Sequence, residues 1–208
     1  MKTMLSHRPA NDDDPSNPRR KASSAKKAEE AKPMDAEWLE GRALSYISQW
    51  EASEAGVAAL LERKISERCE RTQESPDPVR RLIPALVARL VERNYVNDER
   101  FAEAARARQR KRGSSAARIR ANLHSKGISE SLVNELFDRE EPDVEIRAAW
   151  AFAKRRRLGP YARDRREDRE ASARGRRRDK HLSAFGREGF EYELAERIVD
   201  ADSIPELD

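Results

Sequence analysis

The side chains most able to do chemistry in this sequence are arginines and lysines, which gather in two blocks. Between Ala104 and Ser129 the chain has no Asp or Glu, so the first block carries an unopposed positive charge. Guanidinium and ammonium groups at this density favour contact with nucleic-acid phosphates or with an acidic protein surface. The candidate binding residues of this block are Arg106, Arg108, Arg110, Lys111, Arg112, Arg118, Arg120 and Lys126.

A second basic block runs from Lys154 to Lys180, with thirteen basic residues against five acidic ones. Basic runs are often no more than solvated helix faces, but two blocks in successive units of a repeat favour a binding role. Acidic residues cluster between the blocks, from Glu135 to Glu145, so we expect one basic edge and one acidic edge. The candidate binding residues of the second block are Arg155, Arg156, Arg157, Arg176, Arg177 and Arg178.

The other reactive side chains predict neither a catalytic site nor a metal site. Cys69 is the single cysteine, and His7, His124 and His181 are too scattered to share a metal ion. The sequence has no glycine-rich phosphate loop, no nucleophile turn of a hydrolase and no carboxylate pair framed by apolar residues. We therefore expect a protein that is not an enzyme and that holds no cofactor.

The composition limits the size of any single hydrophobic core. Of the 208 residues, 37% are apolar and 39% are charged, and the net charge is only +4. Typical domains have about 45–50% apolar and about 25% charged residues. No apolar run approaches the roughly 18 residues that span a bilayer, so we expect a cytoplasmic protein without membrane contact. Residues 1–36 hold almost no large apolar side chain, which predicts a disordered tail.

Beyond this tail the apolar residues recur with helical spacing, and no stretch alternates with period two as a strand would. The polar stretch 70–78 ends in two prolines and separates two predicted helices. Trp38, Trp50 and Trp150 are predicted to be core anchors between helices. Tyr161, which lies among arginines, is the aromatic residue best suited to stack on a nucleotide.

The clearest helix boundary lies in the middle of the chain. Asn97 is a suitable N-cap, and Asp98 falls in the first turn, where a carboxylate interacts favourably with the helix dipole. Phe101, Ala104 and Ala105 recur at helical spacing and predict the buried face of this helix.

A short pattern of buried residues and a helix exit recurs along the chain. Gly127 is expected to end a helix in the left-handed conformation, with Ile128 as the apolar contact that closes the exit. An earlier copy departs from the pattern, because Ile65 stands where the glycine would be. The later copy lies 62 residues on, where Leu123, Gly127 and Ile128 correspond to Phe185, Gly189 and Phe190.

These patterns predict an all-α fold, an elongated tandem array of about three short three-helix repeats that follows the disordered tail. Each repeat is too small to bury its apolar face alone and must pack on its neighbours. We place the repeats at residues 37–96, 97–140 and 141–208, with the basic insert in the third, and we expect a monomer.

Several motifs follow one another in a fixed order. They read YVNDERFA at 95–102, a glycine at 113, RIRANL at 118–123, KGIS at 126–129 and REGF at 187–190. Together they resemble the signature of the RecX family of recombination regulators, over roughly residues 37–200. The resemblance implies a small all-helical protein that binds along the RecA nucleoprotein filament and modulates its activity without catalysis of its own.

Two functions from different classes follow. The first is an interaction protein that binds the RecA filament and its single-stranded DNA, with duplex DNA left open as a further ligand, and that mainly inhibits RecA. The second is a stand-alone helical DNA-binding protein or transcription factor, since short three-helix units resemble helix-turn-helix domains. Ser115, Ala116 and Ala117, at the start of the predicted recognition helix, offer little to read bases, which counts against the second function.

Overall fold

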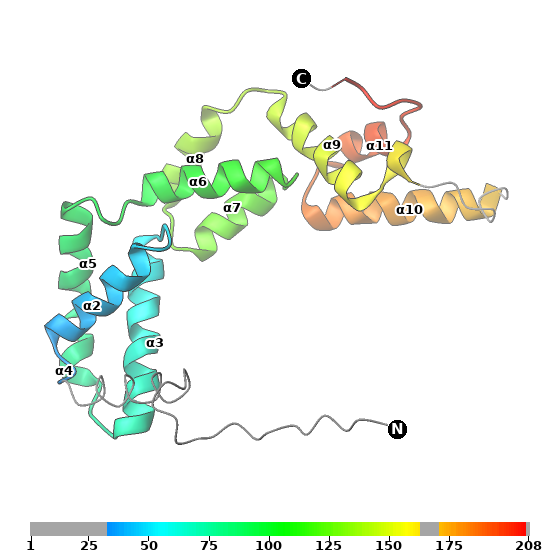
Figure 1. Ribbon diagram of the computed structural model, residues 1–208. Coiled ribbons are helices and arrows are strands. Elements are labelled where there is room, and N and C mark those ends of the chain that lie inside the picture. The colour runs from blue at the N-terminus through cyan, green and yellow to red at the C-terminus, as the bar shows by residue number, and fades with distance from the viewer. Residues whose placement is uncertain (1–32, 163–170, 207–208) are drawn as a thin grey trace, which may run out of the picture.

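The computed structural model describes residues 33–162 and 171–206, and every regular element in these ranges is a helix (Figure 1). The predicted all-α array of three-helix repeats is therefore confirmed. The helices are α2 (Ala36–Ile47), α3 (Glu54–Thr72), α4 (Asp77–Arg80), α5 (Ile83–Glu92), α6 (Asp98–Lys111), α7 (Ala116–Ser125), α8 (Glu130–Asp138), α9 (Val144–Arg156), the 3₁₀ turn η1 (Gly159–Tyr161), α10 (Ala171–Glu188) and α11 (Tyr192–Val199).

Three separate hydrophobic clusters hold the helices together. The first is formed by α2 to α5 around Leu61, the second by α6 to α8 around Leu123, and the third by α9 to α11 around Phe185. In the third cluster the rings of Phe152, Phe185 and Phe190 meet with centroids 5.2–5.7 Å apart. We call these groups of helices units 1, 2 and 3. The exact domain boundaries at 97 and 141 stay predictions.

The units follow one another along a bent path (Figure 1). In this view α3, α7 and α10 lie along the inner side of the bend, and α5 and α8 lie on its outer side. The array is therefore extended rather than folded back on itself, and it presents one helix from each unit to the same side.

The helix boundaries in unit 2 follow from local chemistry as predicted. Asn97 Oδ1 accepts a hydrogen bond from Arg100 N at 2.8 Å, which caps α6. Gly127 has φ of +80°, and the Ile128 N–H donates to the Leu123 carbonyl at 3.1 Å, which closes the exit of α7. Phe101 is only half-buried, whereas Leu123 and Ile128 are buried as expected.

Some sequence-based expectations were wrong in detail. Ala104 is exposed, and its expected place in the core is taken by Ala102. Helix α3 continues to Thr72, past the predicted start of the polar connector. Residues 1–32 of the predicted tail lie outside the described residues, but Asp35 caps α2 and Met34 packs on the first cluster, so the ordered chain begins earlier than predicted.

Units 1 and 2 meet where the start of α3 lies against the exit of α7. Ser53 Oγ caps α3 by accepting from Gly56 N at 3.0 Å, and it also donates to the Lys126 carbonyl at 2.7 Å. A Cβ on Gly127 would lie 2.3 Å from the Cβ of Ala55, so only glycine allows this approach. We call this contact the serine–glycine joint.

The same joint recurs between units 2 and 3. Ser115 Oγ caps α7 by accepting from Arg118 N at 3.1 Å, and it donates to the Glu188 carbonyl. A Cβ on Gly189 would lie 3.1 Å from the Cβ of Ala117. Each residue of the second joint lies 62 positions after its counterpart in the first, in the pairs Ser53 and Ser115, Ala55 and Ala117, Lys126 and Glu188, and Gly127 and Gly189.

The joint requires a hydroxyl, because the capping atom must both accept and donate a hydrogen bond. We expect Ser115→Asp to destabilise the protein by about 1–3 kcal/mol, since a carboxylate keeps the cap but leaves the carbonyl of the half-buried Glu188 without its donor. Chemical denaturation measures the change. The matched control is Ser129→Asp, because Ser129 caps α8 at an exposed position, and its midpoint should stay close to wild type. Equal losses in both variants would contradict the role of the joint.

A second prediction concerns the glycine of the joint. Gly127→Ala should destabilise the protein by about 1–3 kcal/mol, because an L-residue is strained at this backbone conformation and its methyl group meets Ala55. The control is Gly186→Ala, where a Cβ meets nothing within 4 Å inside helix α10, so the change should stabilise by about 0.5–1 kcal/mol. Thermal unfolding compares the two, and stabilisation by both changes would rule the joint out as a constraint.

Candidate nucleic-acid and protein interface

Part of the first basic block forms an exposed surface on α6 and α7. Arg108, Lys111 and Arg112 lie on the last turns of α6, Arg118 lies on the first turns of α7, and Lys126 lies at its exit. All five are exposed, and within the part of the chain that the structure describes none of their side chains has an ion pair or hydrogen bond. We call these five residues the unit 2 cationic surface.

Two other arginines of this block are structural. The Arg110 side chain is only 9% exposed and pairs with Glu140 and Glu145, and Arg106 donates to Glu140 at 2.8 Å. Glu145 also accepts from the Ala116 backbone N–H at 3.0 Å, so the network ties α6, α7 and α9 together. This placement corrects the expectation that Arg106 and Arg110 face a ligand, because their charge is neutralised inside the molecule.

The network also sets the pKa of its central carboxylate. Burial alone would raise the pKa of Glu140, but the hydrogen bonds from Arg110 and then Arg106 outweigh it, and the pKa lies below its ordinary value. Burial would likewise lower the pKa of Arg110, but Glu140 and Glu145 hold it raised. The ion-paired form is therefore kept at neutral pH.

The acidic cluster does not form the free edge that the sequence predicts. Glu140 and Glu145 turn toward unit 2, Glu135 lies 3.9 Å from Arg139, and Asp143 lies 2.9 Å from Arg147. The exposed Glu141 also contacts Arg147, at 3.4 Å. The expected acidic edge is therefore largely paired with arginine.

The side chain of Arg120 on α7 contacts α8. Its guanidinium donates to Asn134 Oδ1 at 2.6 Å and lies 4.4 Å from the ring centroid of Phe137, a geometry in which cation and ring attract each other. Its side chain is therefore held against α8 rather than extended into solvent.

The second basic block is also divided. Arg155, Arg156 and Arg157 are exposed at the end of α9, and Arg157 has the left-handed backbone that ends this helix. Arg178 is paired with Asp200 and Glu196 of α11 at 2.6 and 2.7 Å, and these hydrogen bonds raise its pKa. Arg176 is exposed and Arg177 is half-buried on α10, and residues 163–170 lie outside the described residues.

The aromatic residues differ most from expectation. Tyr161, the expected stacking residue, is half-buried and makes an edge contact with Trp150 at 6.2 Å. Trp150 is buried as predicted and Trp38 is half-buried, but Trp50 is 64% exposed and was wrongly expected in a core. The prediction extended the helical spacing to Trp50, but α2 ends at Ile47, three residues before it.

Neither a metal site nor a membrane span is found in the described ranges. No group of three or more histidine, cysteine, aspartate or glutamate side chains there could hold a metal ion. No described helix is both long and apolar enough to cross a bilayer. Cys69 is half-buried, and His181 is also half-buried and accepts a hydrogen bond from Gly159 N at 3.2 Å.

The chain is similar to known proteins of one family. Residues 97–136, which form α6 to α8, match the family described as RecX, second three-helix domain. A regulatory protein RecX from Myxococcus xanthus (strain DK1622) is 25% identical over 170 residues, which cover 79% of this chain and 85% of that protein. These similarities support the RecX family for this chain, most directly over residues 97–136. A regulatory protein RecX from Deinococcus radiodurans is 31% identical over 94 residues, 45% of this chain and 43% of that protein.

The fold agrees with this assignment. The crystal structure of a regulatory protein RecX superposes with a TM-score of 0.57 at 20% identity, over 89% of this chain and 80% of that one. The segment that matches the family model contains both the unit 2 cationic surface and the arginines that pair with Glu140.

The Glu140 network predicts a pH-dependent stability. Glu140→Gln should lower the free energy of unfolding by about 1–3 kcal/mol at neutral pH, because Arg110 keeps Glu145 but loses the carboxylate of Glu140. Since the folded pKa is depressed, this stability is present above the ordinary pKa and is lost as the pH falls through the folded pKa. Urea denaturation at neutral and acidic pH should therefore show the difference from wild type shrinking in acid.

The matched control is Glu141→Gln. Glu141 is 76% exposed and contacts Arg147 at the surface, so its neutralisation should change stability by less than about 1 kcal/mol at either pH. A Glu140→Gln variant as stable as this control at neutral pH would show that the buried network contributes nothing.

Proposed function

We propose that this RecX protein binds the RecA nucleoprotein filament and modulates RecA, mainly by inhibition, in recombination and DNA repair. It acts in the cytoplasm by occupying a binding surface, without catalysis and without a cofactor. The observation that carries the proposal is the unit 2 cationic surface inside the segment that matches the family. A filament of protein and DNA offers both kinds of partner that such a surface suits, phosphates and acidic side chains.

The shape of the array supports a filament as the partner. Three small cores in a row give a long surface for their mass, with α3, α7 and α10 along one side of the bend (Figure 1). A repeating ligand can be contacted at successive points by such an array. Phosphate contacts of this kind are independent of base sequence, as a modulator of the whole filament requires.

The alternative, a stand-alone helix-turn-helix DNA-binding protein, is less well supported. A recognition helix presents its N-terminal residues to the major groove. In this chain the N-cap of α7 is buried against unit 3, because Ser115 donates to the Glu188 carbonyl and Gly189 lies close to Ala117. The N-cap of α3, Ser53, is likewise buried against unit 2.

Removing charge from the unit 2 cationic surface tests the proposal. The double variant Arg108→Gln and Arg118→Gln should bind RecA-coated single-stranded DNA more weakly and should relieve inhibition of DNA-dependent ATP hydrolysis by RecA. Glutamine keeps the side-chain length and the helix while it removes the charge, so the fold should survive. If these arginines bind phosphate, the log–log salt dependence for bare single strands should become shallower by about 0.7 for each phosphate that is no longer neutralised.

The control removes the same charge elsewhere. Arg81→Gln with Arg197→Gln neutralises two exposed arginines of units 1 and 3 that, in the described chain, have no ion pair. This control should inhibit RecA like wild type. A folded Arg108 and Arg118 variant that still inhibits at wild-type concentration would refute the proposal, as would a wild-type protein that ignores RecA and selects one duplex sequence.

A further inference from the structure

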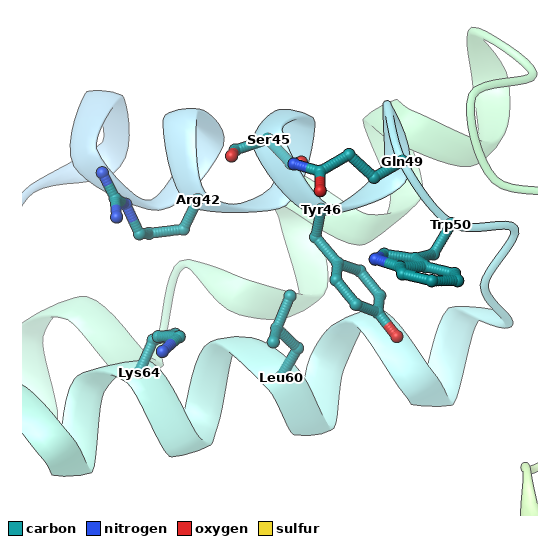
Figure 2. Close-up of a pocket in the computed structure, with 7 residues that line it drawn as sticks. All are labelled: Arg42, Ser45, Tyr46, Gln49, Trp50, Leu60 and Lys64. Carbon is teal, nitrogen blue, oxygen red and sulfur yellow. The ribbon is translucent and has the colours of Figure 1, made fainter.

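A small pocket lies in unit 1 between α2 and α3, away from the unit 2 cationic surface (Figure 2). Its volume is about 180 Å³, well below the roughly 300–1,000 Å³ of pockets that enclose a drug-sized ligand. It is therefore large enough for one ring system of a longer ligand rather than for a whole cofactor. Its lining residues are Arg42, Ser45, Tyr46, Gln49, Trp50, Leu60 and Lys64.

One end of the pocket is aromatic. Figure 2 shows Tyr46 and Trp50 at this end, both reaching from the α2 side toward α3. Tyr46 packs against the first hydrophobic cluster, which fixes its ring, whereas Trp50 is 64% exposed. Tryptophan is highly buried on average, so a mostly exposed indole beside a fixed ring provides an unoccupied flat surface for a planar ligand.

The other end of the pocket is cationic. Arg42 of α2 and Lys64 of α3 line this end from the two facing helices, and Leu60 lies between Lys64 and the aromatic rings (Figure 2). No aspartate or glutamate lines the pocket, although Lys64 pairs at the surface with Glu67 at 2.8 Å. An exposed pair of this kind contributes little energy, so Lys64 can exchange it for another anion.

We propose that this pocket binds one unpaired base of single-stranded DNA, with the base stacked at Trp50 and Tyr46 and a neighbouring phosphate at Arg42 and Lys64. A planar ring joined to an anion matches the two ends of the pocket in both chemistry and order. Stacking uses the face of the ring, which every base has, so the site tolerates any sequence.

The position of the pocket supports this occupant. The loop that carries Trp50 continues into Glu51, which pairs with Arg100 of unit 2 at 2.7 Å, and into Ser53, which donates to the Lys126 carbonyl. The exposed Lys126 therefore lies across the first serine–glycine joint from the loop of Trp50.

The inference deepens the proposed function by assigning it a nucleic-acid site in unit 1, and it rests on that function only for the idea that the ligand is single-stranded DNA. It does not require RecA, so bare DNA can test it. The full chain is titrated into labelled oligothymidylate and into an abasic oligonucleotide of the same length at low salt, with anisotropy as the readout. Quenching of tryptophan emission reports on the exposed Trp50 at the same time.

Trp50→Ala should weaken binding of oligothymidylate by about 5- to 100-fold, the fold-change expected when one base loses its aromatic stacking partner. It should leave binding of the abasic strand nearly unchanged, because that strand offers phosphates but no base. Trp50→Phe should restore most of the affinity, since phenylalanine also stacks. Tyr95→Ala is the matched control, because Tyr95 is 53% exposed in the same part of the chain and does not line the pocket.

Three results would overturn the inference. The first is wild-type affinity of Trp50→Ala for oligothymidylate, and the second is an equal loss for the abasic strand. The third is quenching of Trp50 by an acidic peptide with one phenylalanine and none by DNA, which would make the pocket a peptide site. If Trp50→Ala binds normally while the Arg108 and Arg118 variant loses filament inhibition, the pocket inference fails and the proposed function stands. If the Arg108 and Arg118 variant still inhibits RecA while the Trp50 variants behave as expected, the proposed function fails and the pocket inference stands.

Discussion

The architecture depends on a serine hydroxyl at each joint that makes hydrogen bonds to two helices. At each joint a serine caps a helix of one unit as acceptor and donates to the last-turn carbonyl of a helix in the next unit. A glycine with positive φ must follow that carbonyl, because any side chain would collide with the capped helix. A carboxylate adds to each joint, with Asp98 accepting from Glu54 N at 2.8 Å and Glu145 accepting from Ala116 N. Small cores with few apolar residues are thereby held in a fixed order.

The residues of the joint are incomplete in the two outer units. In unit 1 the glycine of the pattern is replaced by Ile65, which is fully buried as α3 passes through that position. In unit 3 the serine is replaced by Arg177, in the interior of α10. The joint therefore forms between units 1 and 2 and between units 2 and 3, where both the serine and the glycine are present.

The helix ends could be predicted from the sequence because they depend on local chemistry. Contacts between residues far apart in the chain could not. Asn97, Gly127 and Ile128 were predicted correctly because a cap or a helix exit depends on residues a few positions apart. Arg110 could not be told from Arg108 by its neighbours, since its burial depends on Glu140, 30 positions later. The prediction for Trp50 was wrong because the helical spacing was extended to a residue that lies beyond the end of α2. Sequence thus predicted the elements well and the roles of charged and aromatic side chains less well.

The ion pairs of Glu140 and Glu145 also affect the electrostatic field around the exposed arginines of α6. Arg106 and Arg110 lie one turn apart on α6 and face Glu140, whereas Arg108 and Arg112 lie on other sides of the same helix. Because Glu140 and Glu145 turn inward to the buried arginines, they are not available to neutralise the exposed ones. The buried network therefore has two effects, since it fixes unit 3 against unit 2 and leaves the unit 2 cationic surface unopposed. Stability of the second joint and strength of the binding surface are consequently linked through the same two glutamates.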